Sequence, residues 1–174
     1  MRTAARAKAR SGRVRWAARI VGAGLTATAA LGIAAGPALA QAGPPSDQGV
    51  QPVLSPDMNP PVSCPTGATG FRVEEPAVGT TNVPIPGDDA KTFELTVTNT
   101  DQGQVFSFHI PDDAQRAAVQ VTAKGGNVGA NVYTYDSMRF PNGEVIDGSL
   151  HAPINPSNKF ADLSHIDFCL IPCP

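Results

Sequence analysis

Apolar and polar residues alternate along several short stretches of this chain, and this alternation constrains the fold more than any other feature. From Phe93 to Val97 every second residue is apolar, which places those side chains on one face of an extended chain. A period of two is the spacing of a strand with one buried face, whereas a helix needs a period near 3.6. The same alternation occurs in residues 104–110, 117–123 (through Val119 and Val121), 131–135 and 163–170, and more weakly in 71–74.

Turn-forming residues separate these stretches, for example at residues 86–89, 99–103 and 141–143. Short strands with turns at this spacing are typical of an antiparallel β-sandwich. With 17 Gly, 17 Pro and 6% aromatic residues, the composition argues against a helical bundle, a coiled coil and collagen. The sequence therefore predicts one all-β domain over residues 64–174, an antiparallel β-sandwich of immunoglobulin-like or jelly-roll-like type.

Two stretches between the predicted strands have expectations of their own. Residues 112–116 follow Pro111 and are expected to wind into one helical turn, with Asp112 as its cap. Residues 135–163 are rich in turn formers and are expected to be one long loop. Loops of this length are uncommon unless they bind something or pack under their own side chains. This loop is therefore the first place to look for function.

The first forty residues differ from the rest of the chain in charge. They hold seven of the 13 Lys and Arg residues and none of the 15 Asp and Glu residues. A basic stretch, an uncharged apolar run over 20–35 and small residues at 38–40 form the pattern of a secretory signal peptide cleaved after Ala40. A membrane anchor is the alternative, but the apolar run is shorter than the roughly 20 residues that span a bilayer. We therefore expect a secreted, extracellular protein.

Cleavage after Ala40 would leave a net charge of −9 on residues 41–174. An acidic domain is repelled by phosphate backbones and by anionic membrane surfaces. Neither nucleic acid nor, after cleavage, a membrane is therefore expected as a partner. A surface glycan and another protein are the two classes of partner that remain compatible with the sequence.

Residues 41–63 contain six prolines in 23 residues. Proline fixes φ and lacks a backbone N–H, so we expect this segment to be a disordered, extended tether without strand pairing. The tether would act as a spacer that holds the domain off a surface. An N-terminal segment without any role is an equally supported alternative.

Three cysteines follow the predicted cleavage site: Cys64, Cys169 and Cys173. In an exported protein they are expected to be oxidised, which leaves one over. In an extended chain Cys169 and Cys173 lie roughly 13 Å apart, beyond the reach of a disulfide. We favour a Cys64–Cys169 bridge, which would close the domain, with Cys64–Cys173 second. A metal site is not expected, because no further Cys or nearby His completes a set of ligands.

Three segments together resemble a bacterial family. Residues 124–136 read KGGNVGANVYTYD, residues 150–155 read LHAPIN and residues 163–169 read LSHIDFC. In this order they resemble a family of secreted and surface-exposed bacterial β domains with the pattern KGG…NVYxYD…LHAPIN…LSHIxFC. The Arg- and Ala-rich leader likewise resembles those of high-GC Gram-positive bacteria. The resemblance covers residues 64–169, implies the Cys64–Cys169 pairing, makes Cys173 an addition of this chain and implies no particular reaction.

Tyrosine, histidine and polar side chains gather in and around residues 135–163. Paired tyrosines beside a loop are one way in which sandwich domains hold ligands, although at least one of the two is expected in the core. We expect no catalytic residue and no cofactor. The predicted binding face consists of Tyr133, Tyr135, Asp136, His151, Asn155 and His165.

Two alternative functions would use some of the same residues. A secreted hydrolase would use His165 or His151 as its base, but no G-x-S-x-G elbow accompanies them. A calcium-stabilised adhesive domain would use Asp136, Asp147 and Asn155, although their spacing matches no 12-residue calcium loop. The sequence favours an exported, non-catalytic module for surface interaction or structure, with its ligand left open.

Overall fold

Residues 41–173 are described by the computed structural model of this protein. The predicted signal peptide, residues 1–40, lies outside the described residues, as does Pro174. The described part contains nine strands and one 3-10 helix. In chain order they are β1 (Val53–Ser55), β2 (Thr69–Glu74), β3 (Gly79–Ile85), β4 (Asp88–Thr100), β5 (Gly103–His109), η1 (Asp112–Ala114), β6 (Arg116–Gly125), β7 (Ala130–Thr134), β8 (Ile146–Leu150) and β9 (Leu163–Pro172).

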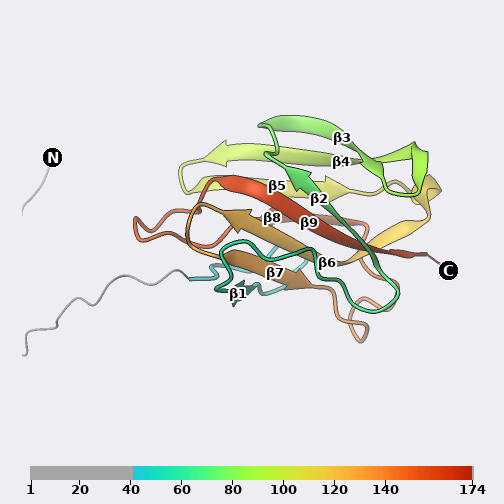
Figure 1. Cartoon of the computed structure of the whole chain (residues 1–174), viewed down its shortest axis with the longest axis horizontal. Coiled ribbons are helices and arrows are strands. Elements are labelled where there is room, and N and C mark those ends of the chain that lie inside the picture. The colour runs from blue at the N-terminus through green and yellow to red at the C-terminus, as the bar shows by residue number, and fades with distance from the viewer. Residues whose placement is uncertain (1–40, 174) are drawn as a thin grey trace, which may run out of the picture. The chain divides into compact units, whose positions relative to one another are not determined.

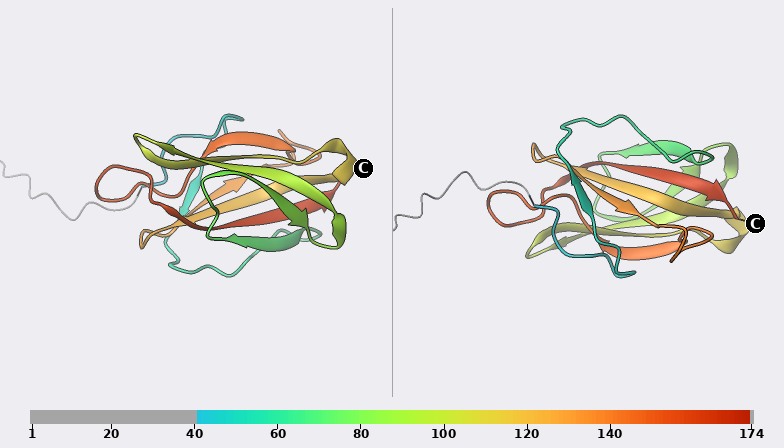
Figure 2. Two further views of the ribbon diagram at one scale, coloured as in Figure 1. Left: turned by 90° about the horizontal axis from the view of Figure 1, so that it is seen from above. Right: turned by 90° about the horizontal axis from the view of Figure 1, so that it is seen from below.

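These strands form two antiparallel sheets that pack face to face (Figure 1). The first sheet has the strand order β1-β7-β6-β9-β2 and the second has the order β3-β4-β5-β8. The two layers are visible edge-on in both views of Figure 2. The predicted all-β antiparallel sandwich is therefore confirmed, while its immunoglobulin-like or jelly-roll-like type stays a prediction.

The core between the sheets consists largely of the apolar residues that alternate with polar ones along the predicted strands. Phe93 of β4 and Phe168 of β9 are both about 1% exposed or less, and their rings meet edge to face at 4.9 Å between centroids. Leu95 and Val97 continue the buried face of β4. Each such side chain contributes about 1.5–3 kcal/mol on burial, so apolar contact between the layers holds the sandwich together.

Two local details differ from the prediction. A β-bulge in β6 between Ala118 and Gln120 shifts the alternation, so that Ala118 is buried and Val119 is only half-buried. A bulge places two residues of one strand opposite one of its partner, which a strict period of two does not anticipate. The predicted helical turn is a three-residue 3-10 helix whose N-cap is Pro111 rather than Asp112, and no side chain caps it.

Three strands that the alternation did not reveal, β1, β3 and β8, lie at sheet edges. Because β8 falls inside residues 135–163 and pairs with β5, the expectation of one uninterrupted loop there was wrong. An edge strand pairs on one side only, so it tolerates proline, such as Pro84 in β3, and needs less apolar alternation. Edge strands are therefore the part of this sandwich that a periodicity argument misses.

Residues 41–63, called the arm below, are not a disordered tether, and this prediction was wrong. Val53–Ser55 of the arm pair with β7, Gln41 forms a bridge with Ile154, and the side chains of Ser46 and Val50 are buried. Proline removes a backbone donor but leaves its carbonyl oxygen as an acceptor. Arg72 donates to Pro60 O and the buried Asn131 donates to Ala42 O, so a proline-rich segment can be built into the domain through its carbonyl groups.

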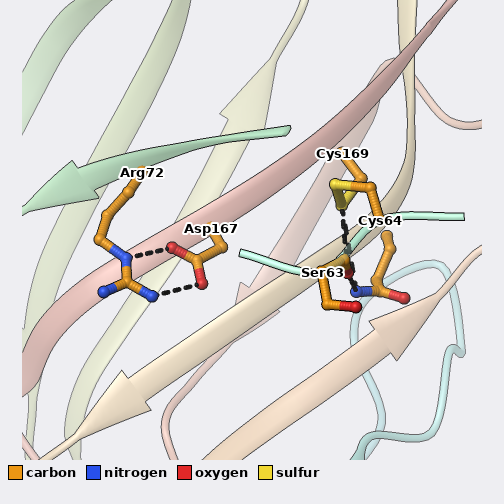
Figure 3. The surroundings of a disulfide bond; sticks show 6 residues. Ser63, Cys64, Arg72, Asp167 and Cys169 are labelled. Atoms are coloured by element: carbon orange, nitrogen blue, oxygen red, sulfur yellow. Dashed lines mark hydrogen bonds and ion pairs between the residues drawn. A yellow bond between two sulfur atoms is a disulfide. The ribbon is translucent and has the colours of Figure 1, made fainter. Parts of the chain in front are cut away.

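After β1 the arm crosses the outer face of the five-stranded sheet, in front of β7 and β6 in Figure 1. The carbonyl oxygen of Pro60 accepts from the Arg72 guanidinium at 2.6 Å, and that of Ser63 accepts from Gln120 Nε2 at 2.9 Å. The Arg72 guanidinium also forms two bonds with the Asp167 carboxylate, at 2.6 and 2.9 Å (Figure 3). Polar contacts thus hold the arm against this face.

The predicted Cys64–Cys169 disulfide ties the end of the arm to β9 (Figure 3), with the two Cα atoms 5.5 Å apart. Gly70 of β2 lies beside it, and a Cβ there would come within 2.6 Å of Cys64 Sγ. Only glycine therefore leaves room for the bridge at this point. Cys173 is a free, half-buried cysteine. Among residues 41–173 there is no helix long and apolar enough to cross a membrane.

Candidate functional site

Five polar side chains form a buried polar cluster beneath the arm: Asn131, Tyr133, Tyr135, Asp147 and His151. The Tyr133 hydroxyl donates to the carbonyl oxygen of His151 at 3.1 Å and accepts from its backbone N–H at 3.0 Å. The Tyr135 hydroxyl donates to Asp147 Oδ2 at 2.8 Å. Burial raises the pKa of both tyrosines, so both stay protonated and act as donors.

His151 is completely buried, and both of its ring nitrogens face carbonyl oxygens. Nδ1 lies 2.8 Å from Ala152 O and Nε2 lies 3.2 Å from Pro44 O in the arm. Desolvation lowers the pKa of His151, and the two carbonyl contacts oppose this only in part. A neutral ring carries one N–H and donates to one of the two oxygens, so the ring is engaged in structure.

Asn131 and Asp147 join the cluster to the arm. The Asn131 side-chain amide donates to Ala42 O at 2.7 Å and to His151 O at 3.0 Å. Asp147 Oδ1 accepts from the backbone N–H groups of Gln48 at 3.0 Å and Gly148 at 2.8 Å. Since the Tyr135 hydroxyl donates to the other carboxylate oxygen, both oxygens of Asp147 accept hydrogen bonds inside the protein.

His165 lies on the other face of the five-stranded sheet. It alternates in β9 with Ile166 and Phe168, whose side chains enter the core, and it pairs with Lys124 of β6 and Glu74 of β2. Desolvation, followed by the positive charge of Arg72, lowers the pKa of His165. Its Nε2 is buried and has no hydrogen-bond partner within the described residues.

The remaining two residues of the predicted binding face are turn-closing side chains. Asp136 is exposed, and its Oδ1 accepts from the backbone N–H groups of Met138 and Arg139, each at 3.1 Å. Asn155 is half-buried, and its Oδ1 accepts from the N–H groups of Ser157 at 2.9 Å and Lys159 at 3.2 Å. Both oxygens therefore shape local turns.

The structure brings Tyr133, Tyr135 and His151 together, but it does so in the interior. These three residues consequently form no exposed binding face, which corrects that part of the prediction. Asp147 is a poor candidate for a calcium ligand, because its buried carboxylate already accepts three hydrogen bonds. Within residues 41–173 no group of three or more His, Cys, Asp or Glu side chains is arranged to hold a metal ion.

An open groove of about 430 Å³ lies between the β4–β5 turn and residues 155–162. This volume is within the range of small-ligand sites, roughly 300–1,000 Å³. One wall carries Asn99 and Gln104, a cross-strand pair that flanks the turn. The other wall carries Asn155, Ser157, Lys159 and Phe160.

Hydrogen bonds hold the two walls of the groove together. The N–H of Phe160 donates to Gln102 O at 2.6 Å, and the N–H of Leu163 donates to Gln104 Oε1 at 2.8 Å. Gly103 lies between the walls with φ +116°, and a Cβ there would collide with Phe160 O. The groove is therefore part of the fold rather than a gap between loose loops.

Two amide groups of the groove remain available to a ligand. Among the described hydrogen bonds, the side chains of Asn99 and Asn155 take part only through Oδ1, and Asn99 Oδ1 accepts from Gln104 Nε2 at 3.3 Å. Each Nδ2 carries two N–H groups. The oxygens are thus engaged inside the protein, whereas no described hydrogen bond uses either Nδ2.

A second hollow of about 290 Å³ lies on the outer face of the four-stranded sheet. His109 and Glu94 lie across from each other there, with Nδ1 and Oε2 3.7 Å apart and both side chains more than half exposed. An exposed contact of this kind contributes little to stability, even where both groups are charged. The pair has no buried or oriented partner that would mark it as a reaction centre within the described residues.

Sequence reasoning identified one residue of the groove, Asn155, and missed the rest. The turn at 99–103 was predicted, and a hairpin register places Asn99 opposite Gln104, so this wall could have been derived. The opposite wall could not, because its contact with the turn depends on tertiary packing around Gly103 and Phe160.

Comparisons with known proteins found no match: no family model, no curated protein and no solved structure matches this chain. The resemblance to secreted and surface-exposed bacterial domains therefore stays a prediction.

Proposed function

We propose that this chain is an exported, non-catalytic β-sandwich module that binds a partner outside the cell through the groove. The proposal rests on one difference between the predicted binding face and the groove, namely whether side-chain N–H groups remain without a hydrogen-bond partner. The histidines and tyrosines of the predicted site are buried, whereas Asn99 and Asn155 line an open groove and carry N–H groups that no described hydrogen bond uses. Binding rather than proton transfer is the chemistry that such neutral amides supply.

Export is supported by the leader pattern and by the Cys64–Cys169 disulfide, because disulfides persist in oxidising compartments. The full chain should be produced in a secreting bacterial host and its N-terminus determined in the medium and in the cells. We expect an exported form that begins at Gln41, with Cys64 and Cys169 blocked to thiol reagents. A chain retained in the cell with residues 1–40 attached would overturn the export part of the proposal.

Binding is tested with the exported form and the extracellular envelope fraction of the cells that produce it. The groove variant, Asn99→Leu with Ser157→Leu, replaces one exposed polar side chain on each wall by an alkyl group. The control variant, Asn82→Leu with Ser137→Leu, makes the same changes at exposed positions outside the groove. We expect retention by the unaltered chain and the control variant, and loss in the groove variant. Equal retention of both variants would refute the groove as the binding surface.

The hydrolase and the calcium-stabilised adhesive domain have less support. The ring nitrogens of His151 face carbonyl oxygens, and His165 lies on the opposite side of the sheet from it. The Ser164 hydroxyl donates to Lys124 O rather than to a histidine. A serine, a base and an orienting carboxylate are therefore not brought together by these residues.

A further inference from the structure

The lining of the groove indicates the chemical class of its ligand. Its polar side chains are mainly amides and hydroxyls, from Asn99, Gln104, Asn155 and Ser157. An amide offers a donor and an acceptor on one planar group, and a hydroxyl offers both on one atom. The natural complement of such a surface is a ligand that also carries donors and acceptors side by side, as the neighbouring hydroxyl groups of a sugar do.

The charge of the groove disfavours ionic ligands. Lys159 and Asp162 line it with opposite charges, so their contributions cancel. The domain around it carries a net charge of −9 over residues 41–174, which repels anions at a distance. A cation would find only one carboxylate in the groove, opposed by the lysine. A neutral ligand is therefore favoured over a charged one.

Phe160 supplies an apolar surface between these polar groups. Its ring is stacked on His151, with centroids 3.9 Å apart and planes 14° from parallel. Because His151 is completely buried, this stack packs Phe160, which lines the groove, against the interior. A rigid aromatic ring can pack against the C–H face of a pyranose while amides bind its hydroxyl groups.

We infer that the groove binds a neutral saccharide, with Asn99 and Asn155 donating to its hydroxyl groups and Phe160 packing against its C–H face. The inference rests on the proposed function and names the ligand of the same groove. The ligand forms no covalent bond and needs no cofactor.

The test is an NMR titration of the exported form, observed at the side-chain amide groups. The probes are neutral gluco-, manno- and galacto-configured oligosaccharides, an acidic oligogalacturonate and a neutral peptide of Gly and Ser. We expect at least one neutral oligosaccharide to shift the Asn99 and Asn155 NH₂ signals in a saturable manner, with the buried Asn131 NH₂ unchanged. The groove variant should bind that sugar about tenfold more weakly or worse, and the control variant with unchanged affinity.

Three results would overturn the inference: no neutral sugar shifts these signals, the peptide or the acidic sugar shifts them instead, or the groove variant binds the sugar unchanged. The envelope experiment distinguishes a failure of the saccharide inference from a failure of the proposed binding function. Envelope retention that depends on the groove but persists when neutral sugars are added in excess would leave the binding module standing and refute the saccharide. Failure of the chain to bind the envelope at all would refute the binding module itself.

Discussion

The buried polar cluster and the groove both contain polar side chains, but they differ in burial and in how those side chains are paired. In the cluster, Asp147 accepts from Tyr135 and from two backbone N–H groups, and Asn131 donates to the arm. In the groove, Asn99 and Asn155 use only their oxygens internally. Asn131 Oδ1 is the exception in the cluster, since it is buried without a partner among the described residues. The unused Asn99 and Asn155 N–H groups differ from it because they belong to residues that line an open groove.

The two regions meet where His151 stacks on Phe160. The cluster therefore supports the groove wall from inside, and the arm covers the cluster from outside through Ala42 O and Pro44 O. Changes in the cluster or the arm should lower stability, whereas changes at the exposed groove surface should lower binding alone. The predictions below separate these two effects.

The largest loss of stability is expected when the arm is released from β9. Replacing both cysteines, Cys64→Ser with Cys169→Ser, removes a link that spans 105 residues. The free energy of unfolding should fall by about 2–5 kcal/mol, because the unfolded chain gains conformational freedom. Urea denaturation measures the change. Cys173→Ser is the matched control and should stay within about 0.5 kcal/mol of the unaltered chain; an equal loss in the control would contradict the assigned pairing.

A second large effect is expected inside the cluster. His151→Ala removes the ring stacked on Phe160 and the contacts to Pro44 O and Ala152 O. We expect a loss of about 2–4 kcal/mol, from the cavity and from the carbonyl group left without its donor. His109→Ala, at an exposed side chain, should change stability by less than about 0.5 kcal/mol. A stable His151→Ala protein that loses a measurable hydrolytic activity would instead support the hydrolase.

A moderate effect is expected from pH. The folded protein lowers the pKa of both His151 and His165, so the unfolded chain binds more protons as the pH falls through the ordinary histidine range near 6.5. The stability that these residues contribute is complete above that range and is lost below it. The melting temperature should therefore be lower at about pH 5.5 than at about pH 7.5.

His165→Gln tests the source of this pH dependence. The charged groups around His165 are Arg72, Asp167, Glu74 and Lys124, and none of them is removed by the substitution. The difference in melting temperature between the two pH values should shrink in this variant, because one of the two buried imidazoles is gone. A melting temperature that rises on acidification would contradict the account of both histidines.

No effect is expected from calcium. The oxygens of Asp147 are engaged by Tyr135, Gln48 and Gly148, and Asp136 and Asn155 each close a local turn through Oδ1. Adding calcium and then a chelator in excess should leave the melting temperature of the exported form unchanged. A reversible rise with calcium would revive the calcium-stabilised adhesive domain.

The sequence predicted the strands in which apolar and polar residues alternate and missed the strands that lack this alternation. Alternation revealed β4, β5 and β9 because their apolar side chains fill one continuous core. It missed β1, β3 and β8, since an edge strand does not need that pattern. The Cys64–Cys169 disulfide was predicted because Cys169 and Cys173 are too far apart in an extended chain to pair, and because the family resemblance implied this pairing over Cys64–Cys173.

The candidate site was harder to predict because burial is a tertiary property. Tyr133 and His151 looked available in the sequence, yet the arm and the second sheet enclose them. The arm itself was misjudged from its prolines, since a missing donor says nothing about its carbonyl groups. The groove was mostly missed because its two walls are far apart in sequence and meet only around Gly103.

The most direct test of the groove as the working surface is to measure binding and stability on the same groove variant. Asn99→Leu with Ser157→Leu alters two exposed side chains, so its free energy of unfolding should stay within about 0.5 kcal/mol of the unaltered chain. Its retention on the envelope fraction should nevertheless fall about tenfold or more, while the control variant, Asn82→Leu with Ser137→Leu, keeps both properties. Retention that survives in the groove variant, or that is lost only together with its fold, would contradict the account.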